Sequence, residues 1–356
     1  MAFESILITG GAGFVGSSLA IRFKNQFPRV TVTAFDNLHR RGSELNLPRL
    51  RAAGVHFVHG DVRCVEDLEA LPAFDLLIDC AAEPSVQAGA SGTPRYVLNN
   101  NLNGTIQCLE AARLRGAAFM LLSTSRVYPI SAINALPFRE ESTRFCWTDA
   151  GKIAGFSEKG IAESFSLDGP RSFYGASKLA SEILLQEYVY ATGMKGIINR
   201  CGILAGPWQM GKVDQGVITL WVARHYFQKP LQYIGFEGQG KQVRDLLHVD
   251  DLFDLMVLQM GLPEKWDGSV YNVGGGLRTS VSLLELTTAC QTLSGHCVPI
   301  TPVSKTNAMD LRIYLTDARK VEREFGWQPL RGVEQILLDI YQWIDSHHDA
   351  LAPLFE

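Results

Sequence analysis

The chain lacks any apolar segment long enough to cross a membrane, since no hydrophobic run approaches the roughly 18 residues that a spanning helix requires. Its seven cysteines are scattered without C-x-x-C spacing. This argues against both a disulfide framework and a zinc site, and we predict no metal centre. The sequence also has no internal repeat and no basic stripe, and its net charge is −4. We therefore expect neither a membrane nor a nucleic acid as a partner.

What remains is the composition of a soluble globular protein, with 46% hydrophobic and 20% charged residues. A length of 356 residues suits one large domain or two interleaved domains with a sizeable core. A strand is expected to begin within the first five residues, so we expect no signal peptide and a cytoplasmic location. A small anionic ligand is compatible with the negative net charge of the chain, because a local binding site does not depend on the overall charge.

Short apolar runs alternate with longer amphipathic segments through the first 200 residues. Buried strands are predicted for runs such as SILITG (5–10), VTVTAFD (30–36), FDLLIDCAA (74–82) and AAFMLLSTS (117–125). Helices are predicted at 64–71, 95–115 and 174–192. The alternation predicts an α/β fold with a doubly wound parallel sheet of the Rossmann type. Ligands of such sheets bind at the carboxyl ends of the strands.

The rhythm of strands and helices becomes less regular after about residue 196. We expect residues 1–195 to form a dinucleotide-binding domain, to which the chain returns around 241–258. Residues 196–356 are expected to form a smaller, less regular α/β domain that binds the substrate. No flexible linker separates the two.

A glycine-rich segment, ILITGGAGFVG, lies between the first predicted strand and a helix. Gly10 permits a tight turn, Gly13 lets the backbone approach a pyrophosphate, and Gly16 lets helix and strand pack closely. The helix N-terminus, at Phe14 and Val15, supplies N–H groups and partial positive charge for the phosphates. The alternative is that these glycines only make a tight turn.

Asp36 follows Gly16 by 20 residues and ends the second strand, where an acid accepts hydrogen bonds from ribose hydroxyls. It repels a 2′-phosphate, so the predicted cofactor is NAD, although Arg40 and Arg41 nearby leave NADP open. Further cofactor contacts are predicted at strand ends, where ordinary packing is the alternative; the residues are Asn37, Asp61, Val62, Ala81 and Ala82.

The stretch SFYGASK places Tyr174 and Lys178 four residues apart, on one face of the predicted helix 174–192. Alone, the two could be a surface pair. A phenol with a reference pKa of about 10 is a poor base, but a neighbouring ammonium and a nicotinamide ring would stabilise its phenolate form. Thr124, at the end of the predicted fifth strand, would then bind the same substrate hydroxyl. With the cofactor site, we interpret Thr124, Tyr174 and Lys178 as catalytic, and Tyr174 and Lys178 also as cofactor contacts.

The motifs TGGAGFVG, FDN, GDVR, NLNGT, YGASK, RDLLHVDD, YNVGGG and FGWQPL together resemble the extended short-chain dehydrogenase/reductase family. The likeness is strongest to its NAD-dependent nucleotide-sugar epimerases and dehydratases. It implies a catalytic triad of Thr124, Tyr174 and Lys178, supported by Asn101 near the cofactor. It also implies a tightly held NAD and a nucleotide-sugar bound between two domains.

The resemblance also bears on the reaction. Dehydratases of the family carry an acidic pair directly after the threonine, and Ser125 and Arg126 stand there instead, so dehydration is disfavoured. Stretches such as FDNLHRRG and GQGKQVRDLLHVDDL resemble epimerases that invert C2 of a CDP-hexose through a 2-keto intermediate. Substrate contacts are accordingly expected from Ser125, Arg126, Lys212, Asp214, Gln215, Arg244 and Arg312.

Three interpretations remain open from the sequence. The first is a nucleotide-sugar 2-epimerase, the second a UDP-sugar 4-epimerase with the same triad, and the third a catalytically silent NAD-binding sensor or scaffold. Family positions are also changed at Asp79, Cys80, Phe173 and Ile203, which leaves the sugar and the base open. The helices at 95–115 and 174–192 resemble those that pair across a two-fold axis, which implies a homodimer or higher homo-oligomer.

Overall fold

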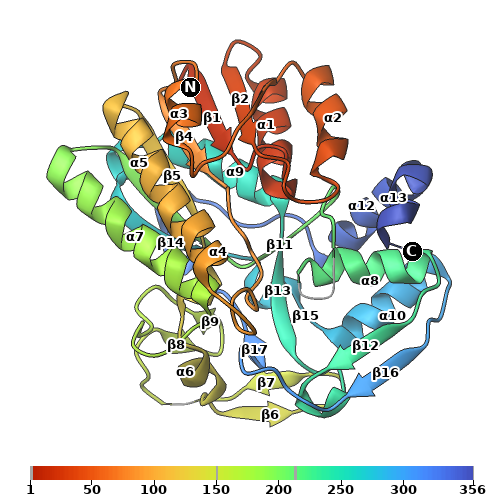
Figure 1. Ribbon diagram of the computed structural model, residues 1–356. Coiled ribbons are helices and arrows are strands. Elements are labelled where there is room, and N and C mark those ends of the chain that lie inside the picture. Colours follow the sequence, from red (N-terminus) through yellow and green to blue (C-terminus); the bar gives the residue numbers. More distant parts are fainter. Residues whose placement is uncertain (1–2, 150, 212–214, 356) are drawn as a thin grey trace.

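A seven-stranded parallel sheet forms the centre of the protein (Figure 1). The computed structural model describes residues 3–149, 151–211 and 215–355. All neighbouring strands of this sheet run parallel, in the order β14-β10-β5-β4-β1-β2-β3. Its strands are β1 (Ser5–Thr9), β2 (Thr31–Asp36), β3 (His56–His59), β4 (Leu76–Asp79), β5 (Ala118–Thr124), β10 (Gly196–Cys201) and β14 (Asp267–Val273).

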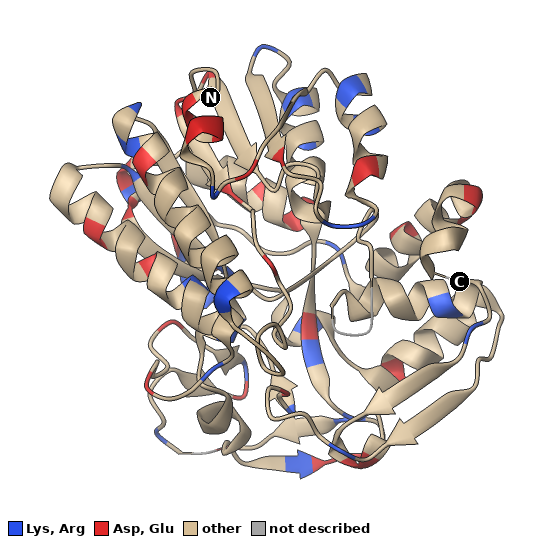
Figure 2. Ribbon diagram, viewed as in Figure 1, with Lys and Arg blue, Asp and Glu red and all other residues tan. Residues whose placement is uncertain are grey.

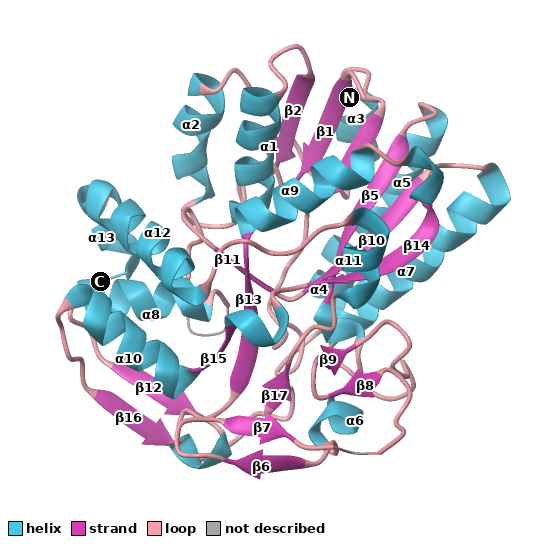
Figure 3. Ribbon diagram, turned by 180° about the vertical axis from the view of Figure 1, so that it is seen from behind, coloured by secondary structure: helices cyan, strands magenta, loops and turns pink. Residues whose placement is uncertain are grey.

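Helices cover both faces of the sheet, which confirms the predicted doubly wound α/β fold. One face, seen in Figure 3, carries α1 (Phe14–Gln26), α9 (Val249–Met260) and α11 (Arg319–Phe325). The opposite face, seen in Figure 1, carries α3 (Val65–Glu69), α5 (Gly104–Leu114) and α7 (Phe173–Thr192). Two short helices, α2 (Leu47–Ala52) and α4 (Arg95–Leu98), lead into neighbouring elements. The helices predicted at 64–71 and 174–192 are confirmed, and the one at 95–115 is interrupted by a π-turn at 99–103.

The inner strands β1, β4 and β5 are mainly apolar because both of their faces are buried. In β1, Ile6 and Ile8 pack with Phe23 of α1 on one side of the sheet. Leu7, between them, packs on the other side with Leu109 of α5. Side chains alternate along a strand, so a strand covered by helices on both sides consists mostly of apolar residues.

A second, smaller part of the chain packs below the carboxyl edge of the sheet (Figure 1). Its helices and most of its strands contribute to the apolar core around Trp221 and Trp343. The helices are α8 (Val217–Tyr226), α10 (Leu283–Ser294), α12 (Val333–Ser346) and α13 (His348–Phe355). The strands are β11 (Ile203–Ala205), β12 (Leu231–Ile234), β13 (Val243–His248), β15 (Ser280–Ser282), β16 (Ile300–Val303) and β17 (Ile313–Tyr314).

Between β5 and α7 the chain makes an excursion that joins the smaller part. It contains one short helix and two small antiparallel hairpins. Its core contains Trp147 and Phe165, packed with Ile313 of β17. The elements are α6 (Ile130–Asn134), β6 (Phe138–Glu140), β7 (Phe145–Trp147), β8 (Phe156–Ser157) and β9 (Gly160–Ile161).

The central sheet does not end at residue 195, where the sequence places the domain boundary. β10 and β14 both come after that residue, yet β10 pairs with β5 and β14 pairs with β10. The chain was expected to return at 241–258, and α9 within that range does pack on α1. The boundary between 195 and 196 is therefore wrong for the sheet, because two of its strands follow it in the sequence.

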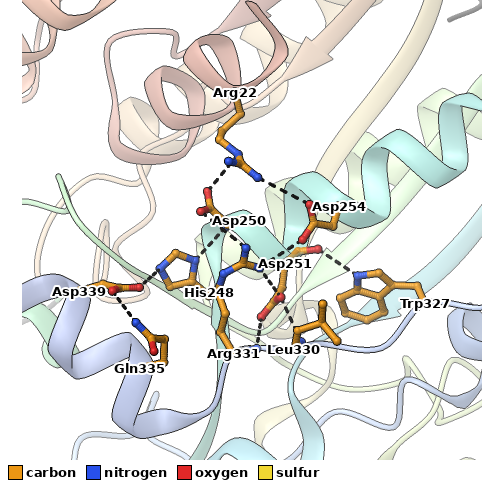
Figure 4. Close-up of polar contacts among 10 residues, drawn as sticks. All are labelled: Arg22, His248, Asp250, Asp251, Asp254, Trp327, Leu330, Arg331, Gln335 and Asp339. Atoms are coloured by element: carbon orange, nitrogen blue, oxygen red, sulfur yellow. Dashed lines mark hydrogen bonds and ion pairs between the residues drawn. The ribbon is translucent and has the colours of Figure 1, made fainter. Parts of the chain in front are cut away.

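A cluster of charged side chains joins the sheet layer to the smaller part (Figure 4). Arg331, before α12, lies 2.6 Å from a carboxylate oxygen of Asp251 and 3.2 Å from one of Asp254, both on α9. His248 caps α9 by accepting a hydrogen bond from the Asp250 N–H, and its other ring nitrogen faces Asp339 of α12 at 3.4 Å. Burial lowers the pKa of His248, which favours the neutral ring that can accept this hydrogen bond.

Acidic and basic residues are interspersed over the ribbon instead of forming one stripe (Figure 2). Within the described parts of the chain, no helix is both long and apolar enough to span a bilayer. Across the same residues, the structure contains no group of three or more His, Cys, Asp or Glu side chains arranged to hold a metal ion.

Candidate active site

One large cavity, of about 1110 Å³, opens at the carboxyl edge of the central sheet and extends into the smaller part. It exceeds the roughly 300–1,000 Å³ of ordinary small-molecule sites, so it has room for more than one ligand group. Most residues predicted for the site line it: Gly10, Gly13, Phe14, Val15, Asp36, Asn37, Val62, Ala81, Ala82, Thr124, Ser125, Arg126, Tyr174, Lys178, Gln215 and Arg244.

The glycine-rich turn between β1 and α1 forms one end of this cavity. Gly10 has a φ of +60°, which L side chains rarely adopt. A Cβ on Gly16 would lie 2.2 Å from the Gly10 carbonyl oxygen, so only glycine permits this close packing of helix and turn. Gly13 precedes α1 in extended conformation and carries no side-chain cap. The first N–H groups of α1 consequently face the cavity, an arrangement suited to a phosphate group.

Asp36 lies beside this turn with both carboxylate oxygens held by backbone. One accepts from the Leu38 N–H at 2.7 Å and the other from the Ala12 N–H at 3.1 Å. Burial raises the pKa of Asp36, and these two N–H groups offset part of that effect. The carboxylate is thus fixed in orientation, and each oxygen keeps a lone pair for a ribose hydroxyl.

Asp61 does not line the cavity, unlike its neighbours Gly60 and Val62. Its carboxylate receives hydrogen bonds from the Arg63 guanidinium and from the Asn37 side chain, at 2.8 and 2.9 Å. These contacts, above all those from Arg63, lower the pKa of Asp61. The Asp61 carboxylate thus helps to position Asn37, which does line the cavity, and its own contact with the cofactor stays a prediction.

The loop after β2 is held against the smaller part, closing one side of the cavity. Arg40 donates to the side chain of Gln215 and, at 2.6 Å, to the Met210 carbonyl. Arg41 donates to the Pro353 carbonyl of α13 at 3.1 Å. A Cβ on Gly42 would lie 2.8 Å from the Met210 side chain and 3.3 Å from that of Leu354. Gln215, predicted as a substrate contact, thus lies at the wall beside Arg40.

A short hydrogen-bonded chain links the predicted catalytic residues. The Thr124 hydroxyl accepts from the Arg126 backbone N–H at 3.1 Å and is hydrogen-bonded to the Tyr174 phenol. The Thr124 oxygen accepts the hydrogen bond from Arg126, and its hydroxyl proton can be donated to the Tyr174 oxygen. Burial raises the pKa of Tyr174 to about 12, and the Thr124 hydrogen bond counteracts this.

Lys178 and Asn101 support the site from within. The Lys178 side chain is 1% exposed and lines the cavity one helical turn after Tyr174. Asn101 is fully buried and does not line the cavity. Its amide accepts from the Glu83 N–H at 2.7 Å and donates to the Glu83 carbonyl at 3.0 Å. The predicted cofactor contact of Asn101 is thus replaced by an indirect role, because its amide holds the backbone of Glu83, which lines the cavity.

Below the catalytic residues lies a buried ion pair between Glu182 of α7 and Arg200 of β10. Arg200 donates through two nitrogens to the Glu182 carboxylate, with the shortest contact at 2.7 Å, and the two side chains are 5% and 2% exposed. Ser123 also donates to Glu182, and Arg200 donates to the Tyr128 hydroxyl at 3.1 Å. The network connects α7 to the strands whose ends carry Thr124 and Cys201.

Gly175 explains how the turn at 125–127 comes so close to the start of α7. A Cβ at this position would lie 2.1 Å from the Arg126 backbone carbonyl oxygen. Glycine is therefore needed there despite its low helix propensity.

We expect Gly175→Ala to destabilise the protein by about 1–3 kcal/mol, because the backbone of residue 126 must move. Thermal unfolding of the purified variant checks this. Ala176→Ser, at an exposed neighbouring position of the same helix, serves as the control and should unfold like the parent. An unchanged or raised melting temperature for Gly175→Ala would contradict the close packing.

The two predicted substrate arginines of the smaller part have different surroundings. Arg244 lines the cavity, and its guanidinium donates to the Val243 and Leu311 carbonyls at 2.7 and 2.6 Å. Burial lowers the pKa of Arg244 to about 9. Arg312 does not line the cavity. Its guanidinium lies 4.0, 5.7 and 5.4 Å from the ring centres of three phenylalanines, which are Phe138, Phe145 and Phe236.

Arg312 thus does not line the cavity in this structure, and its contact with the substrate stays a prediction. Its charge is used in cation–π contacts that tie the β6–β7 hairpin to the segment after β12. The predicted contacts Lys212 and Asp214 lie outside the described residues.

Several cavity residues were not predicted from the sequence. Glu83 and Cys80 follow β4, where only the two alanines had been singled out. Strand-end position could have indicated both. Asp310 reaches the cavity from a loop that is distant in sequence, and no local pattern marks it. The far end of the cavity is formed by Trp221, Arg224, Gln232, Gln242 and Thr301.

The model of the family described as "NAD dependent epimerase/dehydratase family" matches residues 6–274. The chain belongs to this family. It is an NAD-dependent enzyme of the nucleotide-sugar epimerase and dehydratase class, and the predicted recognition, fold and cofactor are confirmed.

The relatives of this family member include enzymes with different reactions. It is 30% identical to a CDP-paratose 2-epimerase of Salmonella typhi, over 96% of this chain and 99% of the relative. A dTDP-glucose 4,6-dehydratase of Salmonella typhimurium is 29% identical, over 95% and 92%. The UDP-glucose 4-epimerase of Thermus thermophilus, crystallised with NAD, superimposes with a TM-score of 0.75 at 25% identity, over 96% and 99%.

The residues at the glycine-rich end of the cavity fit NAD. The glycine turn and the first N–H groups of α1 can approach and bind the pyrophosphate. The oriented carboxylate of Asp36 can accept hydrogen bonds from the adenosine ribose. Arg40 and Arg41 are directed to protein acceptors, so neither needs a 2′-phosphate as a partner.

Asp36→Ala should weaken the retention of NAD, because the ribose loses its acceptor and the Ala12 and Leu38 N–H groups lose theirs. The NAD content per chain after gel filtration, measured on the denatured supernatant, gives the result. Asp67→Ala, which removes an acid bonded to the backbone of residue 61, is the matched control and should retain NAD. Equal NAD content in the Asp36 variant and its parent would exclude Asp36 from the ribose site.

Proposed function

We propose that the protein is an NAD-dependent epimerase that inverts C2 of a CDP-hexose of the paratose and tyvelose type. The observation that supports this most is the similarity to CDP-paratose 2-epimerase along essentially the whole length of both chains. The substitution of Ser125 and Arg126 for the acidic pair of the dehydratases points in the same direction, since elimination of water needs an acid and a base there.

The proposed mechanism assigns one role to each residue of the triad. Bound NAD supplies a reversible hydride acceptor. Tyr174, as phenolate, accepts the proton of the sugar hydroxyl, while Thr124 holds the same hydroxyl by a hydrogen bond. Lys178 provides a positive charge one turn along α7 that favours the phenolate. Once the ketone has turned its other face to the cofactor, the hydride held there would return to the same carbon while Tyr174 gives its proton back to the oxygen, and the configuration would be inverted.

Epimerisation of this kind requires that the diphosphate stays fixed while the sugar reorients. Arg244 is the proposed anchor, because its guanidinium is buried at the cavity wall and carries a charge that suits phosphate oxygens. Ser125 and Arg126 are the proposed sugar contacts, and Gln215, at the wall beside Arg40, is a further proposed contact. The nucleotide is then bound mainly by the smaller part of the chain.

A UDP-sugar 4-epimerase is the second candidate, supported by the structural similarity to the Thermus thermophilus enzyme. It would use Thr124, Tyr174 and Lys178 in the same roles. Only the carbon presented to the cofactor would differ.

A proton NMR time course distinguishes the candidates. The purified protein is incubated separately with CDP-paratose, CDP-glucose, UDP-glucose and UDP-galactose, without added reductant. Inversion at C2 of a CDP-sugar supports the first candidate. Inversion at C4 of a UDP-sugar replaces it by the second. A protein that retains NAD and changes none of the four sugars contradicts both assignments for these substrates.

We further propose that the protein is a dimer through α5 and α7. The outer side of these helices exposes large apolar residues, among them Leu114 (68%), Ile183 (53%) and Tyr190 (89%).

Sedimentation should give twice the 39.3 kDa of one chain. The double variant Ile183→Glu/Tyr190→Glu should sediment as a monomer, because burying two carboxylates opposes association. Leu330→Glu, at a site exposed elsewhere, is the control. A monomeric parent would contradict this interface.

A further inference from the structure

Arg126 has a position that the roles assigned above do not explain. It belongs to the turn at 125–127, directly after the strand that ends in Thr124. Its side chain lines the same cavity as Tyr174, and its guanidinium donates to the Met309 carbonyl at 3.1 Å. The carbonyl carries no charge, whereas the Asp310 carboxylate, which lines the same cavity, acts on the guanidinium and favours its charged form.

The turn and the start of α7 are in direct contact at this point. The Arg126 carbonyl oxygen occupies the space beside Gly175 that any larger residue would fill. The Arg126 N–H begins the hydrogen-bonded chain that passes through Thr124 to the Tyr174 phenol. The backbone of Arg126 is therefore held close to Tyr174 by its contact with Gly175 and by its hydrogen bond to Thr124. Its side chain lines the same cavity as the phenol.

The groups that face Tyr174 act on its ionisation in opposite directions. Burial raises its pKa, and the negative charges of Glu83 and of an ionised Cys201 act in the same sense. The Thr124 hydrogen bond and the charge of Arg126 lower it. Lys178 adds a further positive charge from the same helix. A phenol in such a buried site needs compensating cations to ionise near neutral pH.

We propose that the Arg126 guanidinium is a permanent positive charge that holds Tyr174 in its phenolate form and so sets the lowest pH at which the enzyme works. Arginine suits this role because it stays protonated throughout the working range of an enzyme. Arg126 is therefore a positioning residue: its charge acts on the reaction only through the ionisation of Tyr174. The proposal rests on the proposed function of Tyr174 as the proton acceptor, and on no particular sugar.

The ionisation of Tyr174 can be followed without substrate. The NAD-bound protein is labelled with ¹³C at the hydroxyl-bearing ring carbon of tyrosine, and the signal of Tyr174 is assigned by its loss in Tyr174→Phe. Arg126→Gln and Arg126→Met remove the charge, and Arg126→Lys keeps it. We expect the titration of Tyr174 to move to higher pH by about 1 pH unit or more in the two neutral variants. Arg126→Lys should restore most of the parent behaviour.

Turnover provides the second readout, with the sugar that the NMR panel identifies. In the neutral variants the acidic limb of the kcat profile should move to higher pH by the same amount, so turnover lost at neutral pH returns in alkaline solution. Arg171→Gln is the control. It removes another arginine close to Gly175 whose guanidinium donates to the Leu167 and Gly169 carbonyls, and it should leave both profiles unchanged.

Two results would overturn the proposal. One is an unchanged Tyr174 titration in a folded neutral variant that still holds NAD. The other is a raised KM with an unchanged kcat profile, which would make Arg126 a substrate contact only. If no sugar reacts even with the parent protein, the proposed function fails, but the titration of Tyr174 still decides the role of Arg126.

Discussion

Replacing Tyr174 by phenylalanine should lower turnover by roughly 10²–10⁴-fold, the usual contribution of a general acid–base group. The phenol is hydrogen-bonded to Thr124 and lies in the cavity beside Lys178, so its loss removes the only acceptor proposed for the substrate proton. The ring itself remains, and the glycine-rich turn and Asp36 still form the phosphate and ribose ends of the NAD site. NAD content should therefore stay at the level of the parent.

The rate is measured with the substrate identified by NMR, and bound NAD by its release on denaturation. Tyr226→Phe, which removes a phenol hydroxyl bonded to Asp345 away from the cavity, is the matched control and should keep its turnover. Full activity of Tyr174→Phe would require a different proton acceptor. Loss of both activity and NAD would mean that the variant damages the cofactor site instead.

Removing one partner of the buried ion pair should have the largest effect on stability. Arg200→Met leaves the Glu182 carboxylate buried without its guanidinium, and breaking such a pair costs about 3–5 kcal/mol. The free energy of unfolding from urea titration checks this. Arg139→Met is the control, because both side chains of its ion pair with Glu141 are exposed.

The double variant Glu182→Leu/Arg200→Met tests the reason for the loss. With both charges removed, no unpaired charge remains in the core, so much of the stability should return. If the double variant is as unstable as Arg200→Met, the loss comes from packing around Tyr128 and Ser123 and the electrostatic explanation is wrong.

The parts of the fold that could be predicted are those with a local cause. Strands buried on both faces are mostly apolar, which made the runs of β1, β4 and β5 recognisable. The turn at Gly10 and Gly16 requires glycine for steric reasons that hold in any sequence context. The interval between Gly16 and Asp36 reflects one helix and one strand, so the acid at the second strand end could also be found.

Arrangements that depend on distant segments could not be predicted. Arg312 has the same residue type as a phosphate contact, and only the packing of Phe138, Phe145 and Phe236 around it decides its partner. The sheet extends beyond residue 195 because β14 returns to it after a long excursion from the end of β10. The residues of a strand do not determine which other strand it pairs with. The closeness of Arg126 to Tyr174 likewise depends on the turn fitting against Gly175.

The contact of α13 with the loop after β2 has a consequence for the order of events during synthesis. Arg41 and Pro353 are 312 residues apart in the chain, and Leu354 packs close to Gly42. The glycine-rich turn, by contrast, lies far earlier in the chain than either contact partner. The wall beside the ribose site can be completed only after translation has passed residue 354. A nascent chain that has not reached this residue lacks the α13 side of the wall.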